Sequence, residues 1–196
     1  WNRGKTWENP ESLWQKTTEE TPSYRALMNH GTQVAQGKHP GEAQELFHLA
    51  LAAATTAPER AMAMGNIGSL HFTLGELDAA FACYVEAIHY DSTQAEIWGN
   101  LGVLWTEMGK KSPTRADRRA RFAGAESYLR QALKLNPNHF QARLGLVNLY
   151  AYTGRQAEAD AERRLLEGKP VNQVLVPYTH VMSPSPVNPS PSFGSE

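Results

Sequence analysis

Few side chains in this sequence have the type and spacing that catalysis needs. Its seven histidines are scattered, and none falls in the HExxH spacing that places two imidazoles on one metal ion. His89 and Asp91 lie near Ser92 at a predicted helix end, but catalysis also needs a pocket, and the sequence indicates none there. Cys83, the one cysteine, lies among packing residues, which predicts an inert thiol. The sequence therefore predicts no catalytic residue, no metal site and no cofactor.

Amide and cationic side chains offer binding chemistry instead. Asn29, Asn66 and Asn100 follow one another at intervals of 37 and 34 residues. An asparagine amide has a donor and an acceptor, so it can pair with the N–H and C=O of an extended peptide without reading its side chains. The segment 110–121 differs, because Asp117 is the only acid among its six cations. These cations are Lys110, Lys111, Arg115, Arg118, Arg119 and Arg121.

The composition narrows the class of protein. The chain is 41% hydrophobic and 20% charged, as is normal for a soluble globular protein. Its net charge of −1 provides no whole-molecule positive field, which argues against a nucleic-acid partner. No apolar run approaches the roughly 18 residues that span a bilayer. A single cysteine excludes an internal disulfide and fits either a cytosolic or a periplasmic protein.

An internal repeat predicts the elements that position these residues. Asn66-Ile67-Gly68 recurs as Asn100-Leu101-Gly102, 34 residues later, and further units precede and follow at offsets of 37 and 45. In the second unit the pattern predicts helices over about 59–74 and 77–90, with Gly75 as a left-handed residue between them. Capping boxes predict three helix starts: Thr56 with Glu59, Thr93 with Glu96 and, in a weaker form, Asn138 with Gln141.

These units resemble the tetratricopeptide repeat. That family has a large residue, Leu-Gly, a second large residue, Gly, Ala, an aromatic, Ala and Pro at fixed spacing. Two units here supply Met64, Ile67-Gly68, His71, Gly75, Ala80, Tyr84, Ala87 and Ser92, and then Trp98, Leu101-Gly102, Trp105, Gly109, Ala125, Leu129, Ala132 and Pro137. The resemblance implies an all-α, right-handed solenoid of about four hairpins, which must stack because one hairpin buries too little apolar surface. The expected bounds are 24–57, 61–94, 95–139 and 140–167, between a capping segment over 1–23 and an extended Pro/Ser-rich tail over 168–196.

The resemblance also implies a groove. In this family the first helices of the hairpins line the concave face, and the position of the three asparagines points into it. They would form a ladder similar to the one with which O-linked N-acetylglucosamine transferases hold peptide backbones. The alternative is that each amide bonds the neighbouring helix. The other expected groove residues are Thr32, Gln36, Ser69, Phe72, Thr73, Thr106, Glu107, Asn148 and Tyr152.

The third unit departs from the repeat. Fifteen residues separate Gly109 from Ala125, where four separate Gly75 from Ala80. The extra segment holds Ser112-Pro113, a favourable helix start. It predicts one helix over about 113–135, whose first turns project beyond the stack. Its cations leave two interpretations open: a solvated helix extension, or a docking knob for an acidic partner or an anionic lipid surface.

The two ends of the chain suggest its setting. Residues 2–31 are similar to the junction at which bacterial O-mannosyltransferase-like membrane proteins enter a C-terminal repeat domain, through Asn2-Arg3, Trp7, Ser12-Leu13-Trp14, Thr21-Pro22 and the run 25–31. This resemblance implies a periplasmic or otherwise extracytoplasmic place, with membrane attachment only through a segment before Trp1; a cytoplasmic place is the alternative. Six prolines and five serines in 169–196 predict an extended tail that docks on its own stack or on a neighbouring copy.

The predicted function is therefore that of a scaffold, and not of an enzyme. Its partner would be a protein or an extended peptide held in the concave groove, and the chain would present acceptor proteins if it belongs to a membrane glycosyltransferase. The alternative is an assembly subunit whose tail occupies the next copy.

Overall fold

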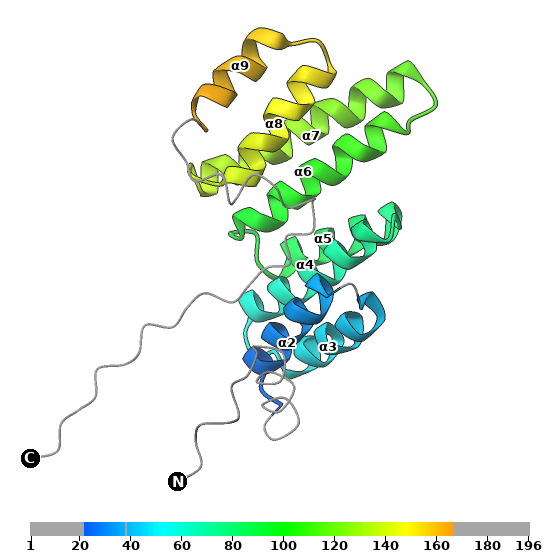
Figure 1. The fold of residues 1–196 in the computed structure, drawn as a ribbon, viewed down its shortest axis with the longest axis vertical. Helices are drawn as coiled ribbons and strands as arrows, with labels where there is room; N and C mark the ends of the chain where they lie inside the picture. The colour runs from blue at the N-terminus through cyan, green and yellow to red at the C-terminus, as the bar shows by residue number, and fades with distance from the viewer. Residues whose placement is uncertain (1–21, 38, 167–196) are drawn as a thin grey trace, which may run out of the picture.

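The computed structural model describes residues 22–37 and 39–166, and these fold into helices joined by short loops (Figure 1). No strand occurs within those ranges, which confirms the all-α prediction. The predicted capping segment lies mostly outside these ranges, and the predicted tail lies entirely outside them.

The helices are α2 (Tyr24–Gln36), α3 (Pro40–Ala53), α4 (Ala57–Thr73), α5 (Leu77–Tyr90), α6 (Ala95–Lys110), α7 (Arg115–Leu135), α8 (Phe140–Tyr152) and α9 (Gln156–Arg164). Among these helices, none is both long enough and apolar enough to cross a bilayer.

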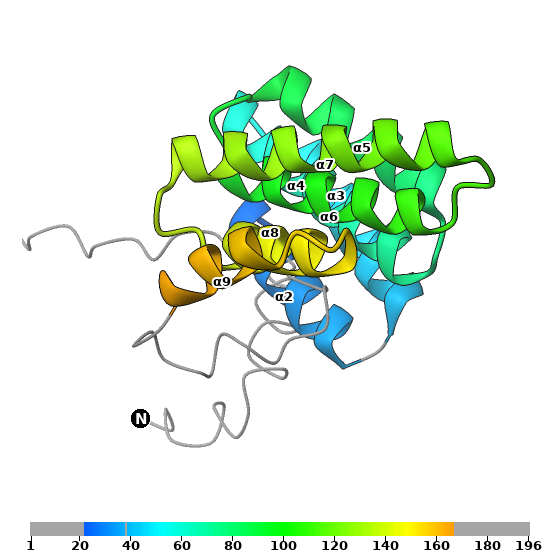
Figure 2. The ribbon, with the colours of Figure 1, turned by 90° about the horizontal axis from the view of Figure 1, so that it is seen from above.

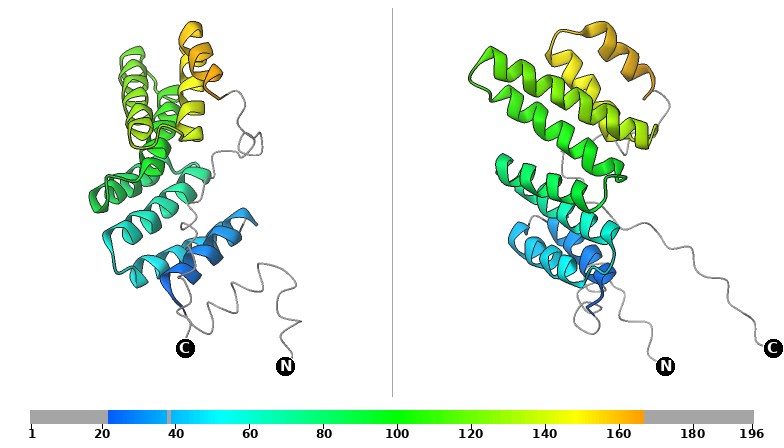
Figure 3. Two further views of the ribbon diagram at one scale, coloured as in Figure 1. Left: turned by 90° about the vertical axis from the view of Figure 1, so that its left-hand side faces the viewer. Right: turned by 180° about the vertical axis from the view of Figure 1, so that it is seen from behind.

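The helices pair in chain order into hairpins: α2 with α3, α4 with α5, α6 with α7, and α8 with α9. The hairpins follow one another along the long axis of the molecule (Figures 1 and 3), and Figure 2 looks down that axis. The helices predicted over 59–74 and 77–90 correspond to α4 and α5, and the one predicted over 113–135 corresponds to α7. The repeat pattern thus predicts these helices to within two residues at each end.

A glycine at one repeat position lets the two helices of a hairpin pack closely. A Cβ added at Gly68 would lie 2.9 Å from the ring of Tyr84, and the equivalent distances in the neighbouring hairpins are 2.7 Å and 2.6 Å. Carbon atoms do not pack this closely, so a large side chain on the second helix occupies the space that a Cβ would need. The pairs are Gly31 with Phe47, Gly68 with Tyr84 and Gly102 with Leu129.

Helix ends follow the sequence predictions only in part. The capping box of Thr56 and Glu59 is present at the start of α4, and Gly75 has a φ of 80° where that helix ends. The box predicted at Thr93 is wrong, because α6 starts after Gln94 with no side-chain cap. The Thr93 hydroxyl instead donates to Asp91 Oδ1 at 2.7 Å, so a local Asp91 turn engages the group that would have capped the helix.

One further end prediction is also wrong. The cap of α8 is His139, whose Nδ1 accepts from the Ala142 N–H at 3.1 Å, and not Asn138. Gly109 occupies the repeat position of Gly75, but α6 continues through it to Lys110. A Cβ at Gly109 would lie 2.5 Å from the Phe122 ring. Because the lengthened α7 packs there, this glycine serves helix contact and not helix termination.

The first helices of the hairpins connect successive hairpins along the stack. We call α2, α4, α6 and α8 the A helices, and α3, α5, α7 and α9 the B helices. Each A helix packs on the next A helix as well as on its own B helix, and the A-to-A contact is most extensive between α6 and α8. Each of α3, α5 and α7 also packs on the A helix that follows it. This arrangement curves a helical-repeat stack with its A helices on the concave face.

The buried side chains form two clusters that meet on α6. One cluster runs from Leu27 on α2 to Leu104 on α6, and the other runs from Val103 on α6 to Ala159 on α9. In α9 only Ala159 is buried. The core is therefore continuous along the stack and thinnest at its last helix, as expected of a terminal repeat.

Candidate binding surfaces

The asparagine ladder is not an exposed row. The side chain of Asn66 is 0% exposed, and that of its neighbour Ser69 is 2% exposed. Asn29 and Asn100 are partly exposed. The Asn66 side chain is therefore not accessible to a peptide, so the structure does not present the three predicted asparagines as one exposed row.

Asn100 bonds the neighbouring helix, as the alternative interpretation expected. Its Nδ2 donates to Ser69 Oγ on α4 at 3.4 Å. Ser69 Oγ donates its own proton to the Gly65 carbonyl at 3.0 Å and lies 3.1 Å from Tyr84 Oη. Since a hydroxyl has one proton, Ser69 accepts from both Asn100 and Tyr84. Burial raises the pKa of the Tyr84 phenol, so this donor stays protonated. The chain of bonds holds α4, α5 and α6 together.

Other predicted groove hydroxyls bond their own helices. Thr32 donates to Met28 O at 2.8 Å, and Thr106 donates to Gly102 O at 3.0 Å. Both side chains are buried. Thr73 makes the same kind of bond, to Ser69 O at 2.9 Å, but it is exposed. Bonds to the carbonyl four residues back are common for mid-helix hydroxyls, so Thr32 and Thr106 contribute to packing and do not present a peptide-binding surface.

One repeat position remains accessible in all four A helices. It holds Gln36, Thr73, Glu107 and Tyr152, which recur at the offsets of the repeat, and we call these four residues the groove row. Gln36, Thr73 and Tyr152 are exposed, and Glu107 is partly so. All four were among the predicted groove residues. Of the remaining predicted residues, Phe72 is half-buried against both core clusters, and Asn148 is exposed on α8.

The aromatic end of the groove row is well anchored. The Tyr152 ring packs edge-on against Phe122 with a centroid distance of 5.4 Å. Lys110 Nζ lies 5.6 Å from the centre of the same ring and 2.5 Å from Glu107 Oε1. These contacts fix Tyr152 and Glu107 relative to each other while leaving Tyr152 53% exposed.

The predicted basic segment runs from Lys110, the last residue of α6, through the loop to the first turns of α7. Residues 113–120 are all exposed. Arg118 donates to the Ser112 carbonyl at 3.3 Å, and Arg121 donates to Met108 Sδ at 3.4 Å while lying 5.9 Å from the Trp105 ring centre. Lys110 pairs with Glu107, as above. Lys111, Arg115 and Arg119 form no ion pair with any described residue.

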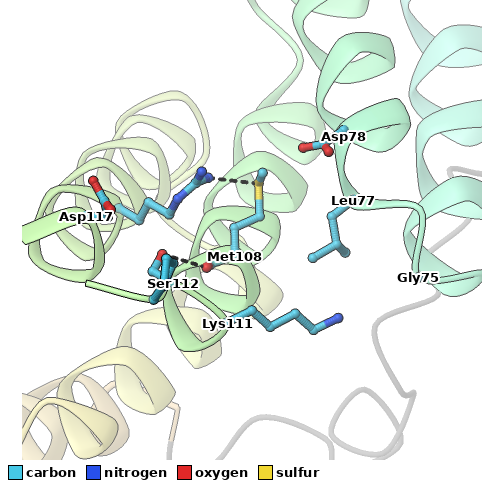
Figure 4. A pocket seen from close by; sticks show the side chains of 9 residues that line it. Gly75, Leu77, Asp78, Met108, Lys111, Ser112 and Asp117 are labelled. Atoms are coloured by element: carbon cyan, nitrogen blue, oxygen red, sulfur yellow. Dashed lines mark hydrogen bonds between the residues drawn. The ribbon is translucent and has the colours of Figure 1, made fainter. Parts of the chain in front are cut away.

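Beside these cations lies a cleft between α5 and α7, which we call the α5–α7 cleft. It consists of two adjoining hollows of about 380 and 420 Å³ that share Asp78, Met108, Asp117 and Arg121. One hollow reaches the loops at Gly75 and Pro113 (Figure 4). The other has Phe81, Trp105 and Ala120 in its walls. The sequence predicted the cations but not the cleft, because α5 and α7 belong to different hairpins.

The described residues offer little for catalysis. No three metal-ligating side chains gather anywhere within the described ranges. Burial and the nearby Glu86 carboxylate raise the pKa of the Cys83 thiol, so it is protonated at neutral pH and a poor nucleophile. The accessible features of the described residues are the groove row and the α5–α7 cleft.

The stacked hairpins and their glycine contacts define a helical-repeat protein. The family model described as tetratricopeptide repeat matches residues 32–96 and 114–172. Because this match covers more than half of the sequence, the chain belongs to the tetratricopeptide repeat family. Proteins of this family are generally non-enzymatic scaffolds that bind proteins or peptides. Comparison with curated proteins finds no match.

Several solved structures share the fold. MamA is 20% identical with a TM-score of 0.56, over 77% of this chain and 81% of that protein. TTC0263, a tetratricopeptide repeat protein of Thermus thermophilus, is 18% identical with a TM-score of 0.66, over 75% of each chain. Human IFIT1, solved as a dimer with m7Gppp-AAAA, is 18% identical with a TM-score of 0.69, over 83% of this chain. The chain spans only 38% of IFIT1. These likenesses concern the fold alone.

Proposed function

We propose that this protein is an interaction scaffold whose concave face holds an extended segment of a partner protein. The observation that carries the proposal is the groove row, a single repeat position that is accessible on every A helix. Beside this row, the bond from Asn100 to the buried Ser69 joins the A helices α4 and α6.

The geometry of a stack suits an extended chain. Packed helices lie about 8–10 Å apart, and an extended chain advances about 3.3 Å per residue. A bound segment would therefore pass one A helix about every three residues, and about nine residues would span the four A helices. The fold thus provides a regular series of contacts to a regular backbone.

The side chains of the groove row can bind the backbone of a peptide at two positions and one of its side chains at a third. Gln36 offers a donor and an acceptor, and the Thr73 oxygen keeps acceptor capacity beyond its bond to Ser69 O. Tyr152 adds an exposed, anchored ring that can pack on an apolar side chain. We expect polar contacts over α2 and α4 and an apolar contact at α8.

A peptide library displayed on phage and selected against the whole chain provides the probe. Selected peptides should bind the variant Thr73→Arg, Tyr152→Ala about tenfold more weakly than the original chain. The matched control is His48→Arg, Leu49→Ala, which alters two exposed residues of α3 and should leave affinity unchanged. Equal binding to both variants, each shown to be folded by circular dichroism, would place the binding surface elsewhere.

Two finer predictions from the sequence belong to the same proposal. One is that the chain is the extracytoplasmic part of a membrane glycosyltransferase-type protein and presents acceptor proteins to it; the sequence that precedes Trp1 in the gene tests this. The other is that the tail, residues 168–196, docks on a neighbouring copy. Sedimentation of the chain with and without the tail tests that hypothesis, which predicts oligomers only when the tail is present.

A further inference from the structure

We propose that the α5–α7 cleft, with the cationic first turns of α7 as its rim, is a second docking site, for an acidic polypeptide segment that inserts one apolar side chain. This surface is formed by B helices and by the loop end of α6, so it is distinct from the groove row on the A helices. The proposal holds whether or not the groove row binds a peptide.

The cations of α7 lie where they oppose helix stability. Arg115 and Arg118 occupy the first turn of the helix, where the backbone dipole favours acids and disfavours cations. Arg118 and Arg119 also follow Arg115 by three and four residues, so each places a like charge beside Arg115 on the surface of the helix. A helix extension serving stability alone would carry Asp or Glu in these positions. The arrangement instead favours a function in which bound negative charge offsets the repulsion.

The acids beside the cleft are already compensated. Asp117 lies in the first turn of α7, where its backbone N–H and its carboxylate both bond the capping Thr114, at 3.0 and 2.7 Å. Asp78 lies in the first turn of α5, whose N-terminus has no side-chain cap, so the partial positive charge of the helix end offsets it. Among residues 22–37 and 39–166, no ion pair offsets the charges of Lys111, Arg115 and Arg119, and these charges attract an acidic partner.

The walls of the cleft supply the apolar part of the site. Phe81, Trp105 and Met108 line it, and the ring centroids of Phe81 and Trp105 lie 6.0 Å apart. A hollow of about 420 Å³ admits a side chain the size of Phe or Leu.

A polypeptide fits this site better than the other anionic partners. A bilayer is flat and would contact only the projecting turns, leaving the recessed Phe81 and Trp105 unused. A nucleic acid is a weaker candidate, because the net charge of −1 provides no extended positive field along which a phosphate backbone could lie. The chain's own tail does not match either, because residues 168–196 contain one Lys and one Glu as their charged residues.

Fluorescence anisotropy with two labelled peptides tests the proposal on the whole chain. The first peptide has about ten Glu and Asp residues around one central Phe, and the second has Ser in place of Phe. We expect the Phe peptide to bind more tightly. Arg115→Glu, Arg119→Glu should weaken both peptides about tenfold or more. The melting temperature should rise slightly, because the acid at position 115 lies in the first turn of α7 and the like-charge repulsion between 115, 118 and 119 is removed. The control Arg60→Glu, Arg164→Glu makes the same charge change at two exposed residues away from the cleft, and should change affinity by less than about twofold.

A third variant isolates the cleft. Ala120 is exposed and lines it, so Ala120→Trp should fill the space and remove the advantage of the Phe peptide without affecting the Ser peptide. The proposal is overturned if the arginine variant weakens binding no more than its control does, or if Phe gives no advantage that Ala120→Trp removes. It is also overturned if vesicles with anionic lipid, or single-stranded RNA, bind more tightly than the Phe peptide through the same arginines.

Discussion

At the scale of single residues, the spacing between paired helices depends on one glycine in each of the first three hairpins. Gly31, Gly68 and Gly102 each face a large side chain at a distance that leaves no room for a methyl group. For Gly68 the facing residue is Tyr84, which is fully buried and held through Ser69 to Asn100 on the next hairpin. The ring therefore cannot move aside without disturbing two hairpins.

Gly68→Ala should accordingly destabilise the fold. Its Cβ would lie 2.9 Å from two Tyr84 ring atoms and 3.1 Å from Cys83 Cβ. We expect a loss of about 1–3 kcal/mol in the free energy of unfolding, as for other overpacked cores. Urea unfolding followed by circular dichroism measures it. Gly41→Ala is the control, since a Cβ there meets nothing within 4 Å and alanine favours a helix by about 0.5–1 kcal/mol. A loss at Gly68 no larger than the change at Gly41 would contradict this account.

At the scale of elements, the sequence predicts helices better than it predicts their ends. Periodic apolar residues and Gly75 place α4 and α5 correctly, and Ser112-Pro113 indicates α7 two residues early. A helix cap depends on which of several nearby polar groups forms a hydrogen bond. The Thr93 hydroxyl bonds the Asp91 carboxylate, and the predicted capping box at Thr93 therefore does not form. The α5–α7 cleft could not be predicted at all, because it requires the packing of two hairpins.

Glu126 joins two neighbouring hairpins. Its carboxylate accepts from Arg155 Nη1 at 2.5 Å, Tyr150 Oη at 2.8 Å and Arg130 Nε at 3.1 Å. Partial burial raises the pKa of this carboxyl, but hydrogen bonds from Arg155, Tyr150 and Arg130 lower it by more, so the pKa falls below its usual 4.5. The ionised carboxylate therefore stabilises the folded state above about pH 4.5, and this stability is lost as the pH falls through the lower, folded-state pKa.

The variant Glu126→Gln tests whether the charge of this carboxylate contributes to the pH dependence of stability. We expect it to lower the free energy of unfolding by about 1–2 kcal/mol at pH 7. The loss should be smaller near pH 3, because the linked stability declines once the pH is below the ordinary pKa of the carboxyl. Urea titrations at both pH values provide the measurement. Glu45→Gln, on the exposed surface of α3, should have no effect at either pH. An equal loss at both pH values would mean that shape, and not charge, is responsible.

At the scale of the whole molecule, the repeat predicts the face on which a side chain lies but not how far that side chain is exposed. Gln36, Thr73, Glu107 and Tyr152 share one repeat position and are all at least partly accessible, whereas Asn29, Asn66 and Asn100 share another and differ in exposure. Depth depends on how closely successive A helices approach, and that distance is set by contacts between units. The sequence therefore predicted the face of the stack that carries the groove row, and only the assembled stack distinguishes its surface from its interior.

The central claim is that an extended chain lies across the A helices, and site-directed photo-crosslinking tests it most directly. A benzophenone amino acid placed in turn at Gln36, Thr73 and Tyr152 should cross-link a selected library peptide at successive points along its sequence. Because neighbouring A helices lie about three extended residues apart, the attachment points for Gln36 and Thr73 should be separated by about that number. The same probe at Glu86, exposed on the B helix α5, should give no cross-link. Equal labelling from Glu86, or one attachment point shared by all three groove positions, would contradict the account.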